Sequence, residues 1–182
     1  MVNLLNNKKK PKWIIFLLLV FFLFLSAYLY FNAMPSYGIK SKTLQAVLQS
    51  LLSKDVPKIS VQDASTQNGN LLFLDAREKE EYNVSHIANA RYVGYKNFVI
   101  KNIEDLPKNT KLIVYCSIGK RSDVIAKQLI NNGYTNIHNL YGGIFEWVNQ
   151  SHPVYKGLVA TNEVHAYNHF WGQWLHKAVR IY

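Results

Sequence analysis

The chain has 182 residues, with 21 basic and 11 acidic side chains that give a formal net charge of +10. Its single cysteine excludes an intramolecular disulfide. Four of the basic residues precede a long apolar run, so the remainder carries 17 basic residues against 11 acidic ones. These are scattered along the chain, so we expect no nucleic-acid partner, and their excess suits small anions or anionic lipid head groups.

Residues 1–12 form a basic tail in front of an apolar run at 13–31 that contains no charged residue. As a helix, this run would measure about 28 Å, which is enough to cross the hydrocarbon core of a bilayer. The positive-inside rule keeps the tail in the cytoplasm and predicts a single-pass membrane protein whose remaining chain is extracytoplasmic and periplasmic-facing. The basic residues of the tail are Lys8, Lys9, Lys10 and Lys12.

A cleavable signal peptide is the alternative to an uncleaved signal anchor. The apolar region of a signal peptide is normally shorter and ends in a small-x-small cleavage site. Ala27 and Ala33 are the candidates for the residue before the cut, and the large Leu25 and Phe31 stand two positions earlier. These features favour an anchor that stays in the membrane, and both alternatives stay open.

Residues 32–56 are interpreted as a linker followed by a helix at 43–53, with Thr43 as its N-cap. Beyond them, short apolar runs alternate with segments of helical spacing. The runs at 71–74, 112–115 and 136–140 predict strands, and the segments at 78–82, 122–131 and 144–148 predict helices or helical turns. This alternation predicts an α/β fold, a compact domain with a central parallel sheet flanked by helices.

Cys116 lies at the junction between a predicted strand and a predicted helix. Gly119 follows in the connecting loop, and Lys120 and Arg121 stand at the start of the helix. Backbone N–H groups, the positive end of a helix and nearby cations all favour thiolate over thiol. We therefore interpret Cys116 as a nucleophile in an anion-binding loop. The alternative is a buried structural cysteine that packs as a small apolar residue.

Residues 154–182 form an aromatic and histidine-rich C-terminal extension. Apolar side chains at helical spacing predict one amphipathic helix over 162–180, or two helices with a break at Gly172. The aromatic side is expected to pack on the domain or to lie in the membrane interface. The opposite side would carry three histidines but no obvious carboxylate, so we expect no metal site. These histidines are His165, His169 and His176.

Several segments together resemble the rhodanese (sulfurtransferase) domain, over about residues 57–153. Residues 59–64 (ISVQDA) are similar to its opening, and 71–90 to a segment in which Asp-x-Arg ends a strand and Glu-Tyr and His-Ile follow. Residues 112–122 (LIVYCSIGKRS) match the loop pattern Cys-x-x-Gly-x-Arg-Ser, and 139–147 (NLYGGIFEW) the closing Gly-Gly-x-x-x-Trp. The chain departs from the family's pattern at Ser85, where glycine is usual, and at Ala88-Asn89, where Pro-Gly is usual.

The resemblance implies a sulfurtransferase in which Cys116 attacks the outer sulfur of a small anionic donor such as thiosulfate and carries it as a persulfide. The sulfur would then pass to a nucleophilic acceptor such as a thiol or cyanide. No metal and no organic cofactor is expected, because the carried sulfur is itself the intermediate. The residues implied to bind the donor anion are Ser117, Ile118, Gly119, Lys120, Arg121 and Ser122.

Three further residues have two interpretations each. Asp75 and Arg77 follow a predicted strand end, where they could contact substrate or form a structural ion pair, and the ion pair is favoured. His86 could act as a general base or bond to backbone in a turn, and the turn is favoured.

Two other functions stay open. A cysteine phosphatase or arsenate reductase would also use a cysteine in an anion-binding loop, but phosphatases place the arginine six positions after the cysteine. Arg121 lies five positions after Cys116, and the tighter loop suits one sulfur atom better. Arsenate reduction would also lack a second cysteine within the chain to resolve an intermediate. A membrane-tethered binding module with an idle loop is the non-catalytic alternative.

Overall fold

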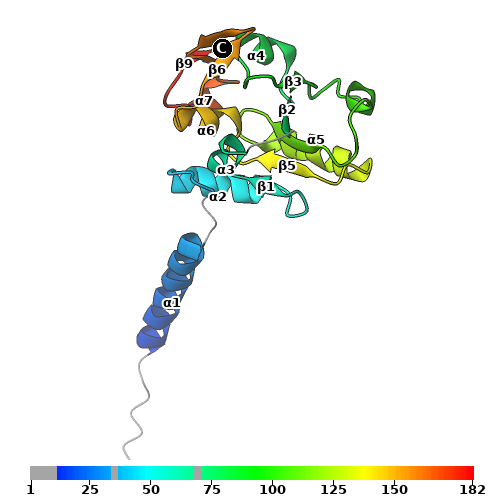
Figure 1. Cartoon of the computed structure of the whole chain (residues 1–182). Coiled ribbons are helices and arrows are strands. Elements are labelled where there is room, and N and C mark those ends of the chain that lie inside the picture. Colours follow the sequence, from blue (N-terminus) through cyan, green and yellow to red (C-terminus); the bar gives the residue numbers. More distant parts are fainter. Residues whose placement is uncertain (1–11, 34–36, 68–70) are drawn as a thin grey trace, which may run out of the picture. The chain divides into compact units, whose positions relative to one another are not determined.

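The structure is a computed structural model of the whole chain, and it describes residues 12–33, 37–67 and 71–182 (Figure 1). The chain divides into two compact units, Met1–Pro35 and Ser36–Tyr182. The first unit contains one described helix, and the second contains all of the described strands.

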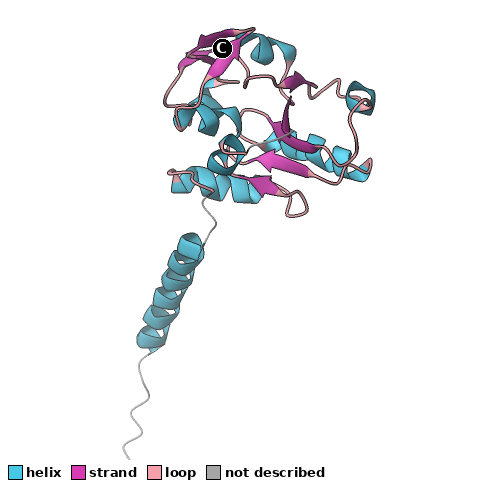
Figure 2. Cartoon of the chain, viewed as in Figure 1, coloured by secondary structure: helices cyan, strands magenta, loops and turns pink. Residues whose placement is uncertain are grey.

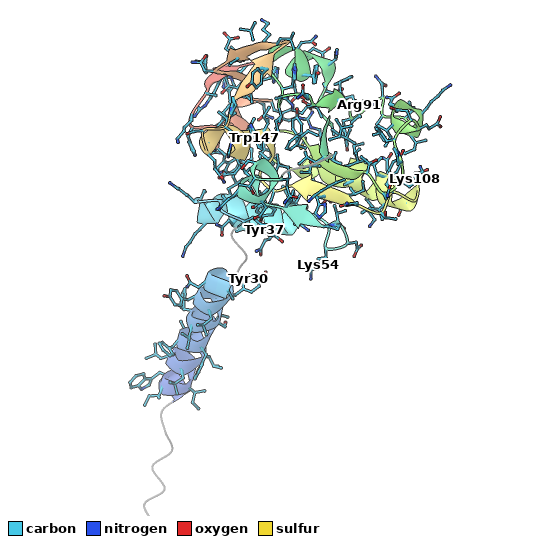
Figure 3. All side chains as sticks on the ribbon, in the orientation of Figure 1. Tyr30, Tyr37, Lys54, Arg91, Lys108 and Trp147 are labelled. Carbon is cyan, nitrogen blue, oxygen red and sulfur yellow. The ribbon has the colours of Figure 1, made fainter. Side chains whose placement is uncertain are left out.

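The first unit contains α1 (Lys12–Ala33). Within it, Trp13–Tyr30 is long and apolar enough to cross a membrane, and none of this stretch is buried. Its side chains project outward around the helix, with Tyr30 near the C-terminal end (Figure 3). A membrane span and a signal sequence both fit this helix. The basic residues Lys8, Lys9 and Lys10, on which the predicted orientation depends, lie outside the described residues.

The second unit is built on a five-stranded sheet in the order β1-β5-β4-β2-β3, and every neighbouring pair runs parallel. This sheet confirms the predicted α/β class. The two edge strands have two residues each, too few to produce an apolar pattern, so the sequence indicated the three inner strands alone. The strands are β1 (Lys58–Ile59), β2 (Leu71–Asp75), β3 (Arg91–Tyr92), β4 (Lys111–Tyr115) and β5 (Ile137–Leu140).

Helices cover both faces of the sheet (Figure 1). Along β4 the side chains alternate, so that Ile113 and Tyr115 join one core cluster while Leu112 and Val114 join the other. Both faces of the parallel sheet are thereby buried, as such sheets require. The first cluster includes residues of α2 (Lys42–Leu51), α3 (Val61–Ser65) and α6 (Gly143–Asn149), and the second includes residues of α5 (Lys120–Asn131) and the 3₁₀ helix η1 (Ile100–Ile103).

The helices α2, α5 and α6 start earlier than the sequence predicts. Ser41, and not Thr43, is the N-cap of α2, because the Ser41 Oγ accepts the N–H of Leu44 at 3.2 Å. The predicted cap is wrong because serine and threonine are similar caps, and the backbone path decides between them. Gly119 and Gly142 precede α5 and α6 with φ angles of +116° and +83°, which glycine adopts without strain.

The predicted helix over 162–180 is wrong. Within this range β8 and β9 pair parallel in a small sheet beside α4 (Lys79–Val84), and the preceding β6 and β7 pair antiparallel. Figure 2 shows strands here and no long helix. Residues 154–182 belong to the same compact unit as the main sheet. Their elements are β6 (Val154–Lys156), β7 (Val159–Thr161), β8 (Glu163–His165), the four-residue α7 (His169–Gly172) and β9 (Val179–Ile181).

Tertiary contacts explain this difference. Val164 and Leu175 share the predicted apolar face, and both are buried in the core cluster without a continuous helix between them. The chain turns at Tyr167, where φ is +65° and the N–H donates to His165 Nδ1 at 3.0 Å. The three histidines of the predicted face therefore lie in a strand, a short helix and a loop. Among the described residues, no group of three or more His, Cys, Asp or Glu side chains could hold a metal ion.

Candidate active site

Cys116 lies between the end of β4 and the start of α5. It is 1% exposed, and its Sγ accepts the backbone N–H of Gly119 at 3.1 Å. The positive φ of Gly119 turns the chain from this loop into α5. A sulfur atom that accepts an N–H at the N-terminus of a helix lies where negative charge is stabilised.

The first residues of α5 present N–H groups that have no acceptor within the helix. The first intrahelical bond runs from the N–H of Asp123 to the carbonyl of Gly119 at 3.1 Å. Three N–H groups come before this bond and have no acceptor within the helix, as at the start of any α-helix. They belong to Lys120, Arg121 and Ser122. Because α5 is 12 residues long, its macrodipole adds positive potential at this end.

The start of α6 binds the carbonyl side of the cysteine loop. The carbonyl of Cys116 accepts the N–H of Ile144 at 2.9 Å, and the carbonyl of Ser117 accepts the N–H of Phe145 at 3.1 Å. In a trans peptide the C=O and N–H bonds point in opposite directions. The N–H groups of Ser117 and Ile118 therefore face away from α6.

Gly143 permits this close approach of two backbone segments. Its φ is +59°, and a Cβ at this position would collide with the carbonyl oxygen of Cys116 and lie 2.6 Å from that of Ser117. The α6 backbone can reach the loop at this distance because Gly143 has no side chain.

An ion pair between Arg121 and Glu81 braces the loop from the other side. Arg121 Nη1 lies 2.5 Å from Glu81 Oε2, and Nη2 donates to Glu81 Oε1 at 2.8 Å and to Ser117 Oγ at 2.9 Å. Burial raises the pKa of Glu81, but the hydrogen bonds and charge of Arg121 outweigh it, and the net effect lowers the pKa. The bidentate pair connects α4 to the start of α5, so Arg121 holds the loop in place.

Asn139, in β5, connects the loop to the sheet. Its Nδ2 donates to the carbonyl of Gly119 at 2.9 Å, and its Oδ1 accepts the hydroxyl of Ser122 at 2.7 Å. The side chain of Ser122 is therefore bound to the sheet, which leaves its backbone N–H as the group it presents at the helix start.

Lys120 is tied to the end of α2. Its Nζ donates to the carbonyl of Leu51 at 2.7 Å, where the negative end of the α2 dipole favours a cation. Lys120 also borders the cavity at Cys116. One donor of its ammonium group is thus engaged by backbone, and the side chain remains exposed.

A small cavity of about 120 Å³ opens at Cys116. A larger cavity of about 710 Å³ lies elsewhere in the second unit and does not reach Cys116, so we assign the site by chemistry and not by size. The ring of Tyr167 covers the guanidinium of Arg121, with 4.8 Å between Cζ and the ring centroid. The cavity is lined by Cys116, Ser117, Ile118, Lys120 and Arg121 of the loop and by Tyr167 and Trp171 of the C-terminal region.

Asp75 and Arg77 form a fully buried ion pair that does not border this cavity. Arg77 Nη2 lies 2.7 Å from Asp75 Oδ2 and donates to the carbonyl of Ser85 at 2.6 Å. Burial lowers the pKa of Arg77, but the charge and hydrogen bonds of Asp75 outweigh it, and the pKa is raised. The pair connects the end of β2 to the turn after α4, which favours the structural interpretation.

His86 lies at a different cavity, which it borders together with Tyr82 and Leu158. Its ring stacks on Tyr82 with 4.0 Å between centroids, and its Nδ1 lies 3.2 Å from the carbonyl oxygen of Tyr82. Its backbone N–H donates to the carbonyl of Tyr155 at 2.9 Å. These contacts favour the turn over a general base acting at Cys116.

Several residues of the site were missed by the sequence analysis. Glu81 and Gly143 lie inside segments that carry the family resemblance, where a carboxylate and a second glycine were available as signals. Tyr167 and Trp171 lie in a region whose pattern predicted a helix, and no local signal places them over Cys116. The missed residues are Glu81, Asn139, Gly143, Tyr167 and Trp171.

Gly143→Ala is expected to destabilise the protein more than Gly157→Ala. Both glycines have φ near +60°, so alanine at either position costs about 1 kcal/mol of backbone strain. Nothing lies within 4 Å of a Cβ at Gly157, whereas a Cβ at Gly143 meets the cysteine loop and adds about 1–3 kcal/mol of overpacking. Urea unfolding of the full chain in detergent measures the loss of unfolding free energy in each variant. Equal losses in Gly143→Ala and Gly157→Ala would contradict the close approach of α6 to the loop.

Glu81→Gln is expected to lower the free energy of unfolding at pH 7 by about 1–3 kcal/mol, because it removes a charge-assisted pair. The folded-state pKa of Glu81 lies below its ordinary value of 4.5, so the stabilisation is complete above that value. It is lost as pH falls through the folded-state pKa, and the difference from wild type should shrink there. The control is Glu80→Gln, at an exposed neighbouring position. A difference in the free energy of unfolding between wild type and Glu81→Gln that does not change with pH would contradict the ion pair.

A family model described as "Rhodanese-like domain" matches residues 60–150. The adenylyltransferase and sulfurtransferase uba4 of Ogataea parapolymorpha is 32% identical over 104 residues, which are 57% of this chain and 26% of that protein. The tRNA uridine(34) hydroxylase of Aster yellows witches'-broom phytoplasma is 28% identical in an alignment of 107 residues that covers 56% of this chain and 34% of that protein. This chain therefore spans about a quarter to a third of the length of these relatives.

Solved structures share the fold. The thiosulfate sulfurtransferase of Pseudomonas aeruginosa matches with a TM-score of 0.53 and 21% identity, over 63% of this chain and 22% of that one. The BH2092 protein of Bacillus halodurans matches with a TM-score of 0.50 and 19% identity, over 64% of this chain and 86% of that one. The match to the family model covers half of the chain and includes β4, the cysteine loop and α5. The chain belongs to the family of proteins with a rhodanese-like domain.

Proposed function

We propose that the protein is a sulfurtransferase that carries a sulfur atom as a persulfide on Cys116. The observation that carries this proposal is the position of Cys116 Sγ, which accepts the Gly119 N–H at 3.1 Å beside the free N–H groups that start α5. Such surroundings stabilise a thiolate, the nucleophilic form of cysteine. The similarity to a relative named as a sulfurtransferase supports the same chemistry.

Sulfur transfer would take place in two displacements at sulfur. The Cys116 thiolate attacks the outer sulfur of a small anionic donor such as thiosulfate, the donor's sulfur–sulfur bond breaks, and its electron pair leaves with sulfite. A nucleophilic acceptor then attacks the outer sulfur of the persulfide, and the electron pair of the broken bond returns to Cys116 as a thiolate. Cyanide would leave as thiocyanate, and a thiolate would leave as a new persulfide. The balance requires no metal and no organic cofactor.

The backbone of the loop would supply the electrostatic stabilisation. The N–H groups of Ser117 and Ile118 face away from α6, and those of Lys120 and Arg121 start α5 beside the sulfur. Together they could bind the negative charge of the persulfide and of departing sulfite. Arg121 would act as a positioning residue, because its guanidinium is already bound.

The same geometry argues against the phosphatase and arsenate reductase alternative. Binding a tetrahedral oxyanion in a bidentate manner requires a guanidinium edge that faces the anion. Arg121 uses both terminal nitrogens on Glu81 and also donates to Ser117. The non-catalytic binding module is separated from a sulfurtransferase by sulfur loading of Cys116.

We also propose that Trp13–Tyr30 anchors the protein in a membrane as a single pass, with the N-terminus cytoplasmic and the catalytic domain extracytoplasmic. The proposed division of the chain is a tail at 1–12, an anchor at 13–31, a linker and helix at 32–56, the rhodanese-like domain at 57–153 and a C-terminal extension at 154–182. The lysines before the apolar run support the orientation.

Protease added to the outside of spheroplasts that express the full chain is expected to degrade the domain. The mass of the untreated chain should show that residues 13–31 are retained. Protection of the domain from protease would contradict the orientation, and a chain that begins after Ala27 or Ala33 would identify a cleaved signal peptide instead.

Incubation of the full chain with thiosulfate is expected to add the mass of one sulfur atom, measured on the intact protein. Cys116→Ser should abolish the gain, because Cys116 is the single cysteine of the chain. Cyanide should remove the added sulfur and release thiocyanate. Absence of an adduct, with Cys116 shown to be reduced and reactive, would contradict transfer from thiosulfate, and parallel incubations with arsenate and with a phosphate ester test the alternative enzymes.

A further inference from the structure

The cavity at Cys116 is partly closed by a segment that follows the region matched by the family model. This segment, residues 167–173, lies between two pairs of buried residues, Val164 and Ala166 before it and Trp174 and Leu175 after it. The carbonyl of Trp174 accepts the Nδ2 of Asn149 at 2.7 Å, which ties its end to α6. Both ends of the segment are therefore held on the domain, while its tip borders the cavity.

Tyr167 occupies a backbone conformation that its side chain disfavours. Its φ of +65° lies in the left-handed region, which costs a non-glycine residue about 1–2 kcal/mol. Such residues persist where their surroundings hold them, and they gather at functional sites. The ring of Tyr167 lies 4.8 Å from Arg121 Cζ, and this contact holds it over the loop.

Trp171 forms the neighbouring part of the cavity wall. Its backbone N–H donates to Asn168 Oδ1 at 2.9 Å, and its ring lies 5.4 Å from that of Trp174 and 5.1 Å from that of Phe170. The short helix α7 thus directs one aromatic side chain, Trp171, to the cavity. Its neighbour Phe170 is 62% exposed and does not border the cavity.

The space left at Cys116 is small. A cavity of about 120 Å³ holds roughly four water molecules, at about 30 Å³ each. Pockets for drug-sized ligands measure about 300–1,000 Å³. Thiosulfate and cyanide are small enough to enter such a space, whereas a tripeptide thiol or the side chain of a folded protein would meet the two rings.

We infer that Tyr167 and Trp171 form a size gate that restricts the sulfur acceptor of Cys116 to small nucleophiles such as cyanide and excludes tripeptide and protein thiols. The identity of the acceptor rests on the proposed function. The gate itself concerns access to Cys116, which can be measured without sulfur transfer. It assigns to the C-terminal extension a role in selecting the acceptor.

The access test compares two maleimides that share a reacting ring and differ in size, N-methylmaleimide and fluorescein maleimide. Both react with Cys116 alone, because the chain has one cysteine. Rates are measured on the full chain in detergent and divided by those of the urea-unfolded chain. In wild type, fluorescein maleimide should react more slowly than N-methylmaleimide. The ratio of its normalised rate to that of N-methylmaleimide should rise by about tenfold or more in the gate variants.

The gate variants are Tyr167→Gly and Trp171→Ala, and the matched control is Phe170→Ala. Glycine suits the φ of +65°, so Tyr167→Gly removes the ring while relieving backbone strain. Phe170→Ala truncates an aromatic residue of the same short helix outside the cavity and should keep the wild-type ratio. Urea unfolding of each variant shows that it is folded.

The acceptor test uses the same variants after loading with thiosulfate, with cyanide and glutathione as acceptors. The rate of discharge by glutathione relative to cyanide should rise in both gate variants and not in Phe170→Ala. An unchanged ratio in both folded gate variants, or equal reactivity of the two maleimides in wild type, would overturn the gate. Absence of loading in wild type, together with size-dependent maleimide rates, would overturn the proposed function and leave the gate supported.

Discussion

The geometry of the site depends on one contact between two backbone segments. The start of α6 binds the carbonyls of Cys116 and Ser117 at 2.9 and 3.1 Å, and Gly143 makes room for it. Because these carbonyls are turned toward α6, the N–H groups of the following residues are turned away from it. The orientation of the N–H groups, on which the proposed anion binding depends, is therefore a consequence of what binds the carbonyls of the loop. The bonds from Arg121 and Asn139 hold the loop in the same conformation.

The two cations nearest to Cys116 each make hydrogen bonds within the protein. Arg121 is paired with Glu81, and Lys120 donates to the carbonyl of Leu51. A buried charge is costly unless it is paired and hydrogen-bonded, which explains the pairing of the largely buried Arg121, whereas Lys120 is exposed. Backbone N–H groups and the α5 dipole add positive potential at the sulfur, and their positions are fixed by the fold.

The C-terminal region changes how the domain boundary is understood. The resemblance and the family model both end near residue 150, yet Tyr167 and Trp171 border the cavity and Val164 and Leu175 lie in the core. The tip that carries these two rings therefore lies between residues that are buried in the core of the domain. The rhodanese-like domain of this chain is thus completed by residues outside the matched region.

The α/β class, the inner strands and the contiguous loop at 116–122 could be predicted from the sequence, because apolar periodicity and a cysteine at a strand–helix junction are local features. The sequence could not predict the two-residue edge strands, the cap at Ser41 or the C-terminal strands. Such short elements form only where segments that are distant along the chain pack or pair with them. The sequence also left the roles of Asp75, Arg77 and His86 open. These residues are 0% to 8% exposed, and their contacts favour structural roles. The tertiary structure alone decided that Glu81 braces Arg121 and that Tyr167 covers it, because these residues lie 40 and 46 positions away along the chain and meet only when it folds.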